Sequence, residues 1–189
     1  MNRYKKTRNV LIFWCLFIGI GAFIGSVGMF LDPTGKLMAM DQLLPYFKVL
    51  PFSDVLFQNY IFSGISLLIV NGITNFIAAY LLIKNKKLGI ILGSVFGFTW
   101  MLWITIQFII FPMNALSTSY FVFGVIQLMT GYMTYVFYEQ ENFKFNPKEY
   151  KNIGVNEDVL VVYFSRMGYT KKIAYEAANK IGTEAELIE

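Results

Sequence analysis

The stretch that decides the fold of the C-terminal region is Val159-Leu160-Val161-Val162-Tyr163-Phe164-Ser165-Arg166-Met167-Gly168-Tyr169-Thr170. Six apolar, β-branched or aromatic residues end at a short polar turn, and a helical pattern begins directly after it. A continuous apolar run of this length is typical of an interior strand in a parallel sheet, covered on both faces. The sequence therefore predicts a buried strand over 159–164, a loop suited to phosphate, and a helix N-terminus.

A strand–loop–helix–strand order follows from the residues after this loop. Thr170 is placed to cap the helix, and apolar side chains recur on one helical face at Ile173, Ala174, Ala177 and Ile181. Gly182 is placed to end the helix, because glycine favours the left-handed conformation found there. The segment 184–189 predicts the opening of a second strand.

The loop at 165–170 has the chemistry of a phosphate site. Successive backbone N–H groups at a helix start donate to an anion, and the helix dipole favours its charge. The hydroxyls of Ser165 and Thr170 add donors at the two ends, and Gly168 permits close approach or a positive φ. The alternative is an ordinary strand–turn–helix connection in which threonine only caps the helix.

The run Val161 to Thr170, followed by Ile173-Ala174, resembles the N-terminal signature of the flavodoxins. That pattern is aliphatic–aliphatic–aromatic–x–Ser/Thr–x–x–Gly–x–Thr, with Ala four residues further on. The resemblance implies a five-stranded parallel sheet with helices on both faces, and FMN that carries one or two electrons. It also implies hydroxyl donors and backbone N–H donors to the FMN phosphate from Ser165, Arg166, Met167, Gly168, Tyr169 and Thr170.

The resemblance covers about thirty residues, 157–189, and many family members carry Ser or Thr where Met167 stands. One strand, one helix and the start of a second strand bury too little surface to fold alone. The family also holds the flavin ring with later loops. We therefore expect a fragment of a longer protein, a truncated gene, or completion by another chain, with weak FMN binding or none by these 189 residues.

The remainder of the chain reads as a membrane protein. The whole chain is 189 residues long, 56% hydrophobic and only 15% charged, whereas about a quarter of the residues in soluble domains are charged. Runs of about 20 apolar residues are long enough to cross a bilayer. The predicted domains are a four-helix transmembrane domain over 1–140, a linker over 141–156 and an incomplete flavodoxin-like domain over 157–189; the predicted spans are 9–31, 58–83, 88–111 and 117–138.

The basic residues indicate an orientation in the cell membrane. Positive charge gathers at 1–8 and in Lys84-Asn85-Lys86-Lys87, whereas the connection 112–116 carries none. The positive-inside rule then puts both termini in the cytoplasm. The net charge of +4 belongs to this topology and is no nucleic-acid signal. The connection 32–58 holds three prolines, and we interpret it as a packed interfacial loop rather than a ligand lid.

Several chemistries are excluded by residue type. The chain has no histidine and one cysteine, Cys15, so we assign no metal site and no catalytic acid or base. The predicted spans hold uncharged polar residues at Asn71, Asn75, Gln107 and Gln127 but no ionisable Asp, Glu, Lys, Arg or His at membrane depth. Proton-coupled transport usually needs such a group, so we predict interhelical hydrogen bonds instead, with Asn71 paired to Gln127.

Two functions remain from the sequence. The first is a membrane-anchored flavodoxin-like protein that performs FMN-dependent electron transfer with a cytoplasmic redox partner, as a carrier or an oxidoreductase once its domain is complete. The second is a non-redox four-helix membrane protein, a transport accessory or scaffold with a vestigial tail. The sequence predicts no oligomeric state.

Overall fold

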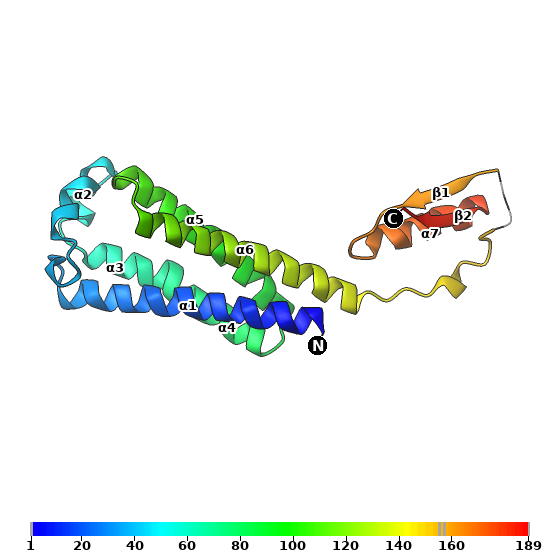
Figure 1. Cartoon of the computed structure of the whole chain (residues 1–189), viewed down its shortest axis with the longest axis horizontal. Coiled ribbons are helices and arrows are strands. Elements are labelled where there is room, and N and C mark those ends of the chain that lie inside the picture. The colour runs from blue at the N-terminus through cyan, green and yellow to red at the C-terminus, as the bar shows by residue number, and fades with distance from the viewer. Residues whose placement is uncertain (1, 155, 157, 189) are drawn as a thin grey trace. The chain divides into compact units, whose positions relative to one another are not determined.

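The computed structural model describes residues 2–154, 156 and 158–188, and the chain divides into two compact units, residues 1–134 and 135–189 (Figure 1). The first unit is helical, and the second holds a small two-stranded sheet. Four helical segments are long and apolar enough to cross a membrane, and each overlaps one of the four predicted spans. These segments are Arg3–Leu31, Ile61–Ile83, Lys87–Ile110 and Ala115–Asn142.

The second span changes its helical winding along its length. It begins as α3, passes through a six-residue π-helical stretch, η3, and continues as α4. A π-helix holds one more residue per hydrogen-bonded turn than an α-helix, and such turns are often found at functional sites. The bounds are α3 Ile61–Leu67, η3 Leu68–Ile73 and α4 Thr74–Ile83, beside α1 Arg3–Leu31, α5 Lys87–Ile110 and α6 Ala115–Asn142.

Glycine lets the backbones of α5 and α6 approach closely. A Cβ added to Gly97 would lie 2.7 Å from the backbone nitrogen of Leu128, and one added to Gly131 would collide with Ser94. Small residues at such crossings are how helices associate in lipid, where burial of apolar side chains provides no drive. Gly21, by contrast, faces open space, whereas a Cβ added to Gly25 would lie 3.2 Å from the Leu67 side chain of α3.

A compact connection joins α1 to α3. It contains η1 Lys36–Met38, η2 Asp41–Val49 and α2 Ser53–Leu56. Its start is held by Asp32, whose carboxylate accepts from the Thr34 hydroxyl at 2.6 Å and from the Leu37 N–H at 2.7 Å. Phe47 and Tyr60 are buried against Ile110 of α5. The connection is therefore packed onto the helix ends, as the sequence predicts for 32–58.

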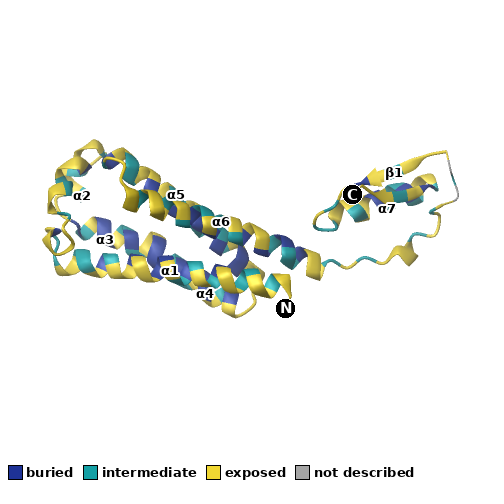
Figure 2. Ribbon diagram, in the orientation of Figure 1, coloured by how far each residue is buried: buried dark blue, intermediate teal, exposed yellow. Residues whose placement is uncertain are grey.

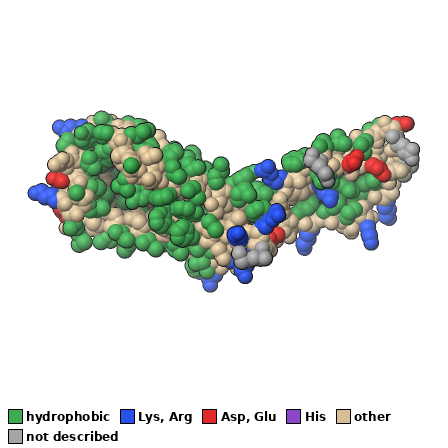
Figure 3. Space-filling model, viewed as in Figure 1, with side chains coloured by type: hydrophobic (Ala, Val, Ile, Leu, Met, Phe, Trp, Pro, Cys, Tyr) green, Lys and Arg blue, Asp and Glu red, His purple; other side chains and the backbone are tan. Residues whose placement is uncertain are grey.

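The outer faces of the helices in the first unit are apolar. Large hydrophobic side chains such as Ile24 and Ile109 are 63% and 69% exposed. The burial colouring shows these exposed positions along the helices, and hydrophobic atoms cover much of the visible face (Figures 2 and 3). Surfaces of this kind are suited to a lipid bilayer.

The second unit contains a parallel strand pair joined by a helix. Strand β1 spans Leu160–Tyr163, α7 spans Tyr169–Ile181 and β2 spans Glu184–Leu187. Leu160 pairs with Glu184, and Tyr163 pairs with Leu187. The observed strand is two residues shorter than the predicted 159–164, and Gly182 ends α7 with φ +84°, as predicted.

The prediction of a strand covered on both faces is wrong for this chain. Val162 is 54% exposed, whereas its neighbour Tyr163 is 8% exposed. Side chains of a strand alternate between faces, and α7 packs on only one face of the pair. On α7 itself Ala174 and Ala178 are buried, while Ile173 is 64% exposed. The outer face of this sheet therefore exposes Leu160 and Val162 of β1 beside their partners Glu184 and Glu186 of β2.

The residues after α6 run alongside α7 in the same direction. The short helix η4 spans Pro147–Glu149. The N–H of Asn152 donates to Oδ1 of Asn179 at 3.0 Å, and the N–H of Asn156 donates to the carbonyl of Gly182 at 2.7 Å. The ring of Phe145 lies 4.7 Å from that of Tyr175, centroid to centroid, in an edge-on arrangement. Much of the segment 143–156 is thus bound to α7.

Candidate functional site

The loop between β1 and α7 is organised by Ser165 and Gly168. The hydroxyl oxygen of Ser165 accepts a hydrogen bond from the Gly168 N–H at 3.0 Å. Gly168 is the N-cap of α7, and its φ of +98° is a conformation that favours glycine. Lys172 N–H donates to the Gly168 carbonyl at 3.1 Å, which is the first backbone bond of the helix. The loop thus presents the start of a thirteen-residue helix.

The predicted cap at Thr170 is wrong, and the reason is the conformation of Gly168. The helix begins at Tyr169, so Thr170 lies within its first turn and is exposed to solvent. The side chain that bonds a loop N–H is instead that of Ser165. Ser165, Met167 and Gly168 are partly buried, whereas Arg166, Tyr169 and Thr170 are exposed. Four of the six predicted site residues, 165–168, form the loop, and Tyr169 and Thr170 form the start of α7.

The last turn of α6 and the residue after it contact this loop within the second unit. Nε2 of Gln140 donates to the carbonyl of Arg166 at 2.8 Å, and the Tyr169 hydroxyl donates to the carboxylate of Glu139. The ring of Phe143 packs against Gly168 so closely that a Cβ there would overlap it. Any side chain at Gly168 would need both a strained φ and a displaced Phe143.

The donor set of the loop fits a phosphate. An α-helix leaves its first N–H groups without partners inside the helix, and its dipole is positive there. Arg166, Lys171 and Lys172 add positive charge, and no Asp or Glu stands between 159 and 175, but Glu139 brings one acidic group to the loop through its bond with the Tyr169 hydroxyl. Lys171 Nζ lies 4.7 Å from the Phe145 ring centroid. Phe143 covers Gly168, so a ligand that approaches the glycine must move this ring.

A polar cluster lies in the interior of the first unit. Nε2 of Gln127 donates to Oδ1 of Asn75 and to the carbonyl of Gly93, both at 2.9 Å. Asn75 in turn donates to the Asn71 carbonyl at 2.9 Å. The predicted pairing of Asn71 with Gln127 is therefore wrong, and Asn75, one turn further on, is the partner. All three side chains are fully buried, which suits a helix-joining role.

Two features escape the sequence reasoning. Gln140, the last residue of the predicted membrane domain, and Phe143, in the predicted linker 141–156, both contact the loop. The clustered aromatic residues Phe143 and Phe145 are the sequence signal that the linker packs. The connection between α1 and α3 also lines a cavity, and its aromatic content between 46 and 62 is the corresponding signal.

Comparison with family models, with curated proteins and with solved structures finds no match to this chain.

Proposed function

We propose that this chain is a membrane-anchored, flavodoxin-like protein in which the loop Ser165–Thr170 holds the phosphate of FMN. The bound flavin would supply transfer of electrons one or two at a time. The first unit anchors the loop to the bilayer, and residues outside the loop hold the flavin ring. The electron donor or acceptor is a cytoplasmic redox partner.

The observation that carries the proposal is the loop at the junction of β1 and α7. Its Gly168 has a left-handed backbone and its Ser165 hydroxyl orders the turn. The neighbouring strands are parallel, and ligands in open parallel sheets bind beyond the carboxyl ends of the strands. The resemblance of 159–174 to the flavodoxin signature selects FMN among phosphate ligands.

Each residue of the loop has a distinct role in this proposal. Backbone N–H groups between Arg166 and Thr170 would donate to the phosphate, with that of Gly168 first released from its bond to the Ser165 hydroxyl, and the exposed Thr170 hydroxyl adds a side-chain donor. The Ser165 hydroxyl keeps the turn in shape and adds a second donor when its proton faces the ligand. Gly168 leaves room for the approach once Phe143 has moved.

The direct test compares FMN with riboflavin, which has the same ring without the phosphate. Fluorescence titration of the detergent-solubilised chain should give saturable but weak FMN binding, at least about tenfold tighter than riboflavin, or about 1.4 kcal/mol. Gly168→Val should abolish this preference, because valine has no space beside Phe143. Thr118→Val, at the start of α6 and distant in sequence from the loop, is the control that should keep the preference for FMN.

Equal binding of the two flavins would contradict a phosphate site. Retained FMN preference in Gly168→Val would contradict its location in this loop. The absence of any saturable FMN signal would contradict the proposal for this chain.

We propose further that both termini face the cytoplasm, which places the loop where FMN is available. The support is the distribution of Lys and Arg, which favours the N-terminus and Lys84–Lys87 on the inner side. In a Cys15→Ala background, a cysteine at Asn114 should react with a membrane-impermeant maleimide in intact cells. A cysteine at Asn85 should react only after lysis, and the reverse pattern would overturn the orientation.

A non-redox membrane protein is the second candidate. The observation in its favour is that the first unit, with its buried Gln127 cluster, makes up most of the chain. Deleting residues 150–189 separates the two candidates. An unchanged cellular phenotype would favour a transport accessory or scaffold, and loss of electron-transfer activity would favour the flavin protein.

A further inference from the structure

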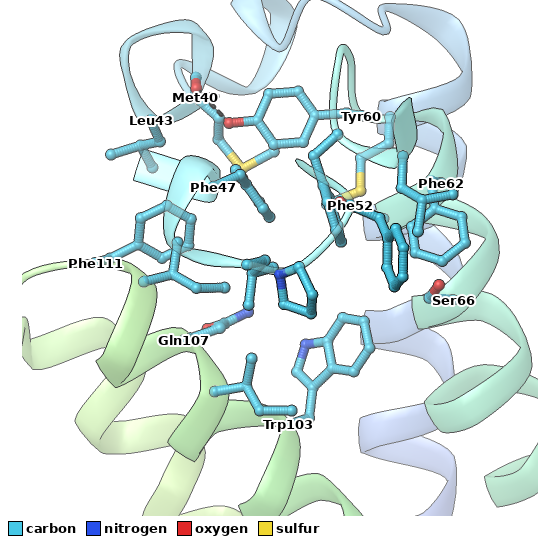
Figure 4. A pocket seen from close by; sticks show the side chains of 18 residues that line it. Met40, Leu43, Phe47, Phe52, Tyr60, Phe62, Ser66, Trp103, Gln107 and Phe111 are labelled. Atoms are coloured by element: carbon cyan, nitrogen blue, oxygen red, sulfur yellow. Dashed lines mark hydrogen bonds between the residues drawn. The ribbon is translucent and has the colours of Figure 1, made fainter. Parts of the chain in front are cut away.

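A cavity of about 390 Å³ lies in the first unit, where α1 and α5 end and α3 begins. The connection between α1 and α3 covers it, through residues of η2 and α2 (Figure 4). Its volume falls within the range of ligand pockets, which is about 300–1,000 Å³. The cavity is separate from the loop at Ser165–Thr170 and shares no residue with it.

The wall of this cavity carries no formal charge. None of its eighteen lining residues is Asp, Glu, Lys, Arg or His. Tyr60, which precedes the span, donates its hydroxyl to the Met40 carbonyl at 2.6 Å. The Tyr60 phenol is neutral at ordinary pH like any tyrosine, and burial, followed by the charge of Asp41, raises its pKa further, to about 12. An ion would lose its hydration here with no opposite charge to replace it.

Aromatic rings dominate the wall. Seven of the lining residues are Phe, Tyr or Trp. The rings of Phe47 and Phe57 stack at a centroid distance of 5.0 Å, and Phe111 meets Phe47 edge-on at 5.3 Å. Trp103 and Gln107 lie at the opposite side of the cavity, as the close view shows (Figure 4). Flat walls of this kind suit a planar ring, which can stack or meet them edge-on.

One polar group in the wall lacks a partner. The hydroxyl of Ser63 is buried, and no described residue forms a hydrogen bond with it. Ser63 is 8% exposed and lines the cavity. A buried hydroxyl without a partner is destabilising, and it marks a place where a ligand atom would be bound once the wall side chains that cover its oxygen move aside. Ser66 and Gln107 add further hydrogen-bonding side chains to the same wall.

We propose that this cavity binds a neutral, lipid-soluble, planar ring compound that carries a carbonyl oxygen, of the quinone class. The uncharged wall favours a neutral ligand, and the aromatic rings favour a flat one. The Ser63 hydroxyl favours a ligand oxygen that accepts a hydrogen bond from it. The acyl chain of a bilayer lipid would also fill an apolar cavity, but it would leave the Ser63 hydroxyl unbonded. Phe52, 77% exposed, marks the rim through which the ring enters.

The test uses two probes that differ only in the carbonyl groups, 2,3-dimethyl-1,4-naphthoquinone and 2,3-dimethylnaphthalene. Native mass spectrometry of the detergent-solubilised full chain should show a saturable one-to-one complex with the quinone. Half-saturation should occur at a concentration at least about tenfold lower than for the hydrocarbon, since a site built for a hydrogen bond discriminates against the analogue that lacks it.

Matched variants assign the binding to the cavity. Ser63→Ala removes the hydroxyl and should bring the two probes to within about twofold of each other. Ser119→Ala makes the same change on an exposed part of α6 and should leave the preference intact. Ser66→Trp fills the cavity and should remove binding of both probes. Each variant is compared by its elution in gel filtration, so that loss of fold is distinguished from loss of binding.

Three results would overturn the proposal. The first is equal binding of the quinone and the hydrocarbon. The second is an unchanged preference in Ser63→Ala. The third is a copurified phospholipid that the quinone does not displace, which would identify the cavity as a lipid site. None of these results bears on FMN binding in the second unit.

Discussion

Both units expose large apolar side chains, but the same observation has opposite meanings in the two. In the first unit, Ile109 is exposed on a helix whose backbone polar groups are satisfied internally. In the second, Val162 and Phe164, 54% and 64% exposed, lie in or next to a strand whose sheet has only two members. Lipid can cover the first surface, whereas the second places Val162 beside the carboxylate of Glu186 on a strand pair with open edges.

The meaning of an exposed apolar side chain depends on how its backbone is hydrogen-bonded. A helix closes its own hydrogen bonds and can meet hydrocarbon directly. A strand pair leaves edges and an outer face that need further strands or helices. Contacts within the helical unit, such as those of Gly97 and Gln127, fix its helix packing. In the strand unit, α7 packs on one face of the strand pair and the other face is exposed.

The largest expected effect comes from breaking the contact of α5 with α6. Gly97→Leu would force a side chain into the backbone of α6 and should destabilise the first unit by about 3 kcal/mol. Denaturation of the purified chain in detergent measures this. Gly21→Leu is the control, because nothing lies within 4 Å of a Cβ there. Similar losses in both variants would refute the crossing.

The next effect separates the two faces of β1. Tyr163→Ser removes a buried ring and should cost about 2 kcal/mol, seen as faster amide exchange across Leu160–Tyr163. Val162→Ser changes the exposed face and should stay within about 0.5 kcal/mol. Equal effects would mean that both faces are covered, and the contrast between the units would disappear.

The interior cluster of the helical unit gives a smaller effect. Gln127→Leu removes the hydrogen bonds to Asn75, Gly93 and Cys15 and should cost about 1–2 kcal/mol in the same denaturation assay. Thr105→Val removes a hydroxyl that bonds only within its own helix on an exposed face, and it should cost less. A larger loss for Thr105→Val would argue that Gln127 does not join helices.

The smallest effect is a pH dependence at the end of α1. Hydrogen bonds from the Thr34 hydroxyl and the Leu37 N–H lower the pKa of Asp32 in the folded chain. Its contribution is therefore present above the unfolded pKa of about 3.9 and is lost as the pH falls through the lower folded value. Unfolding of the wild type and of Asp32→Asn should converge below that range. Parallel curves at every pH would exclude this titration.

The four spans were predictable because length and apolarity alone determine what can cross a membrane. Their pairings were less so, since Asn71 and Asn75 share a helix face and only the packing decides which one meets Gln127. The π-helical stretch at Leu68–Ile73 has no signal in the local composition. The position of β1 followed from its β-branched run, but its exposure depends on how many strands join the sheet.

The place of the loop was predictable because Gly168 permits the backbone that the turn needs, although the predicted helix cap is two residues too late. The error at Thr170 arose because a glycine N-cap gives no side-chain signal, while threonine is a frequent cap. The contacts from Gln140 and Phe143 depend on tertiary packing across 25 or more residues and have no local pattern.

The π-helical stretch sets the rotational phase of the second span. Each α-helical residue turns the chain by about 100°, so one residue more or less between two positions reorients one against the other. Ser63 precedes Leu68–Ile73 and Asn75 follows it. Winding the same residues as a regular α-helix would turn the cavity-facing side of α3 by about 100° against the cluster-facing side of α4. The length of this segment, as much as its composition, keeps both interiors aligned.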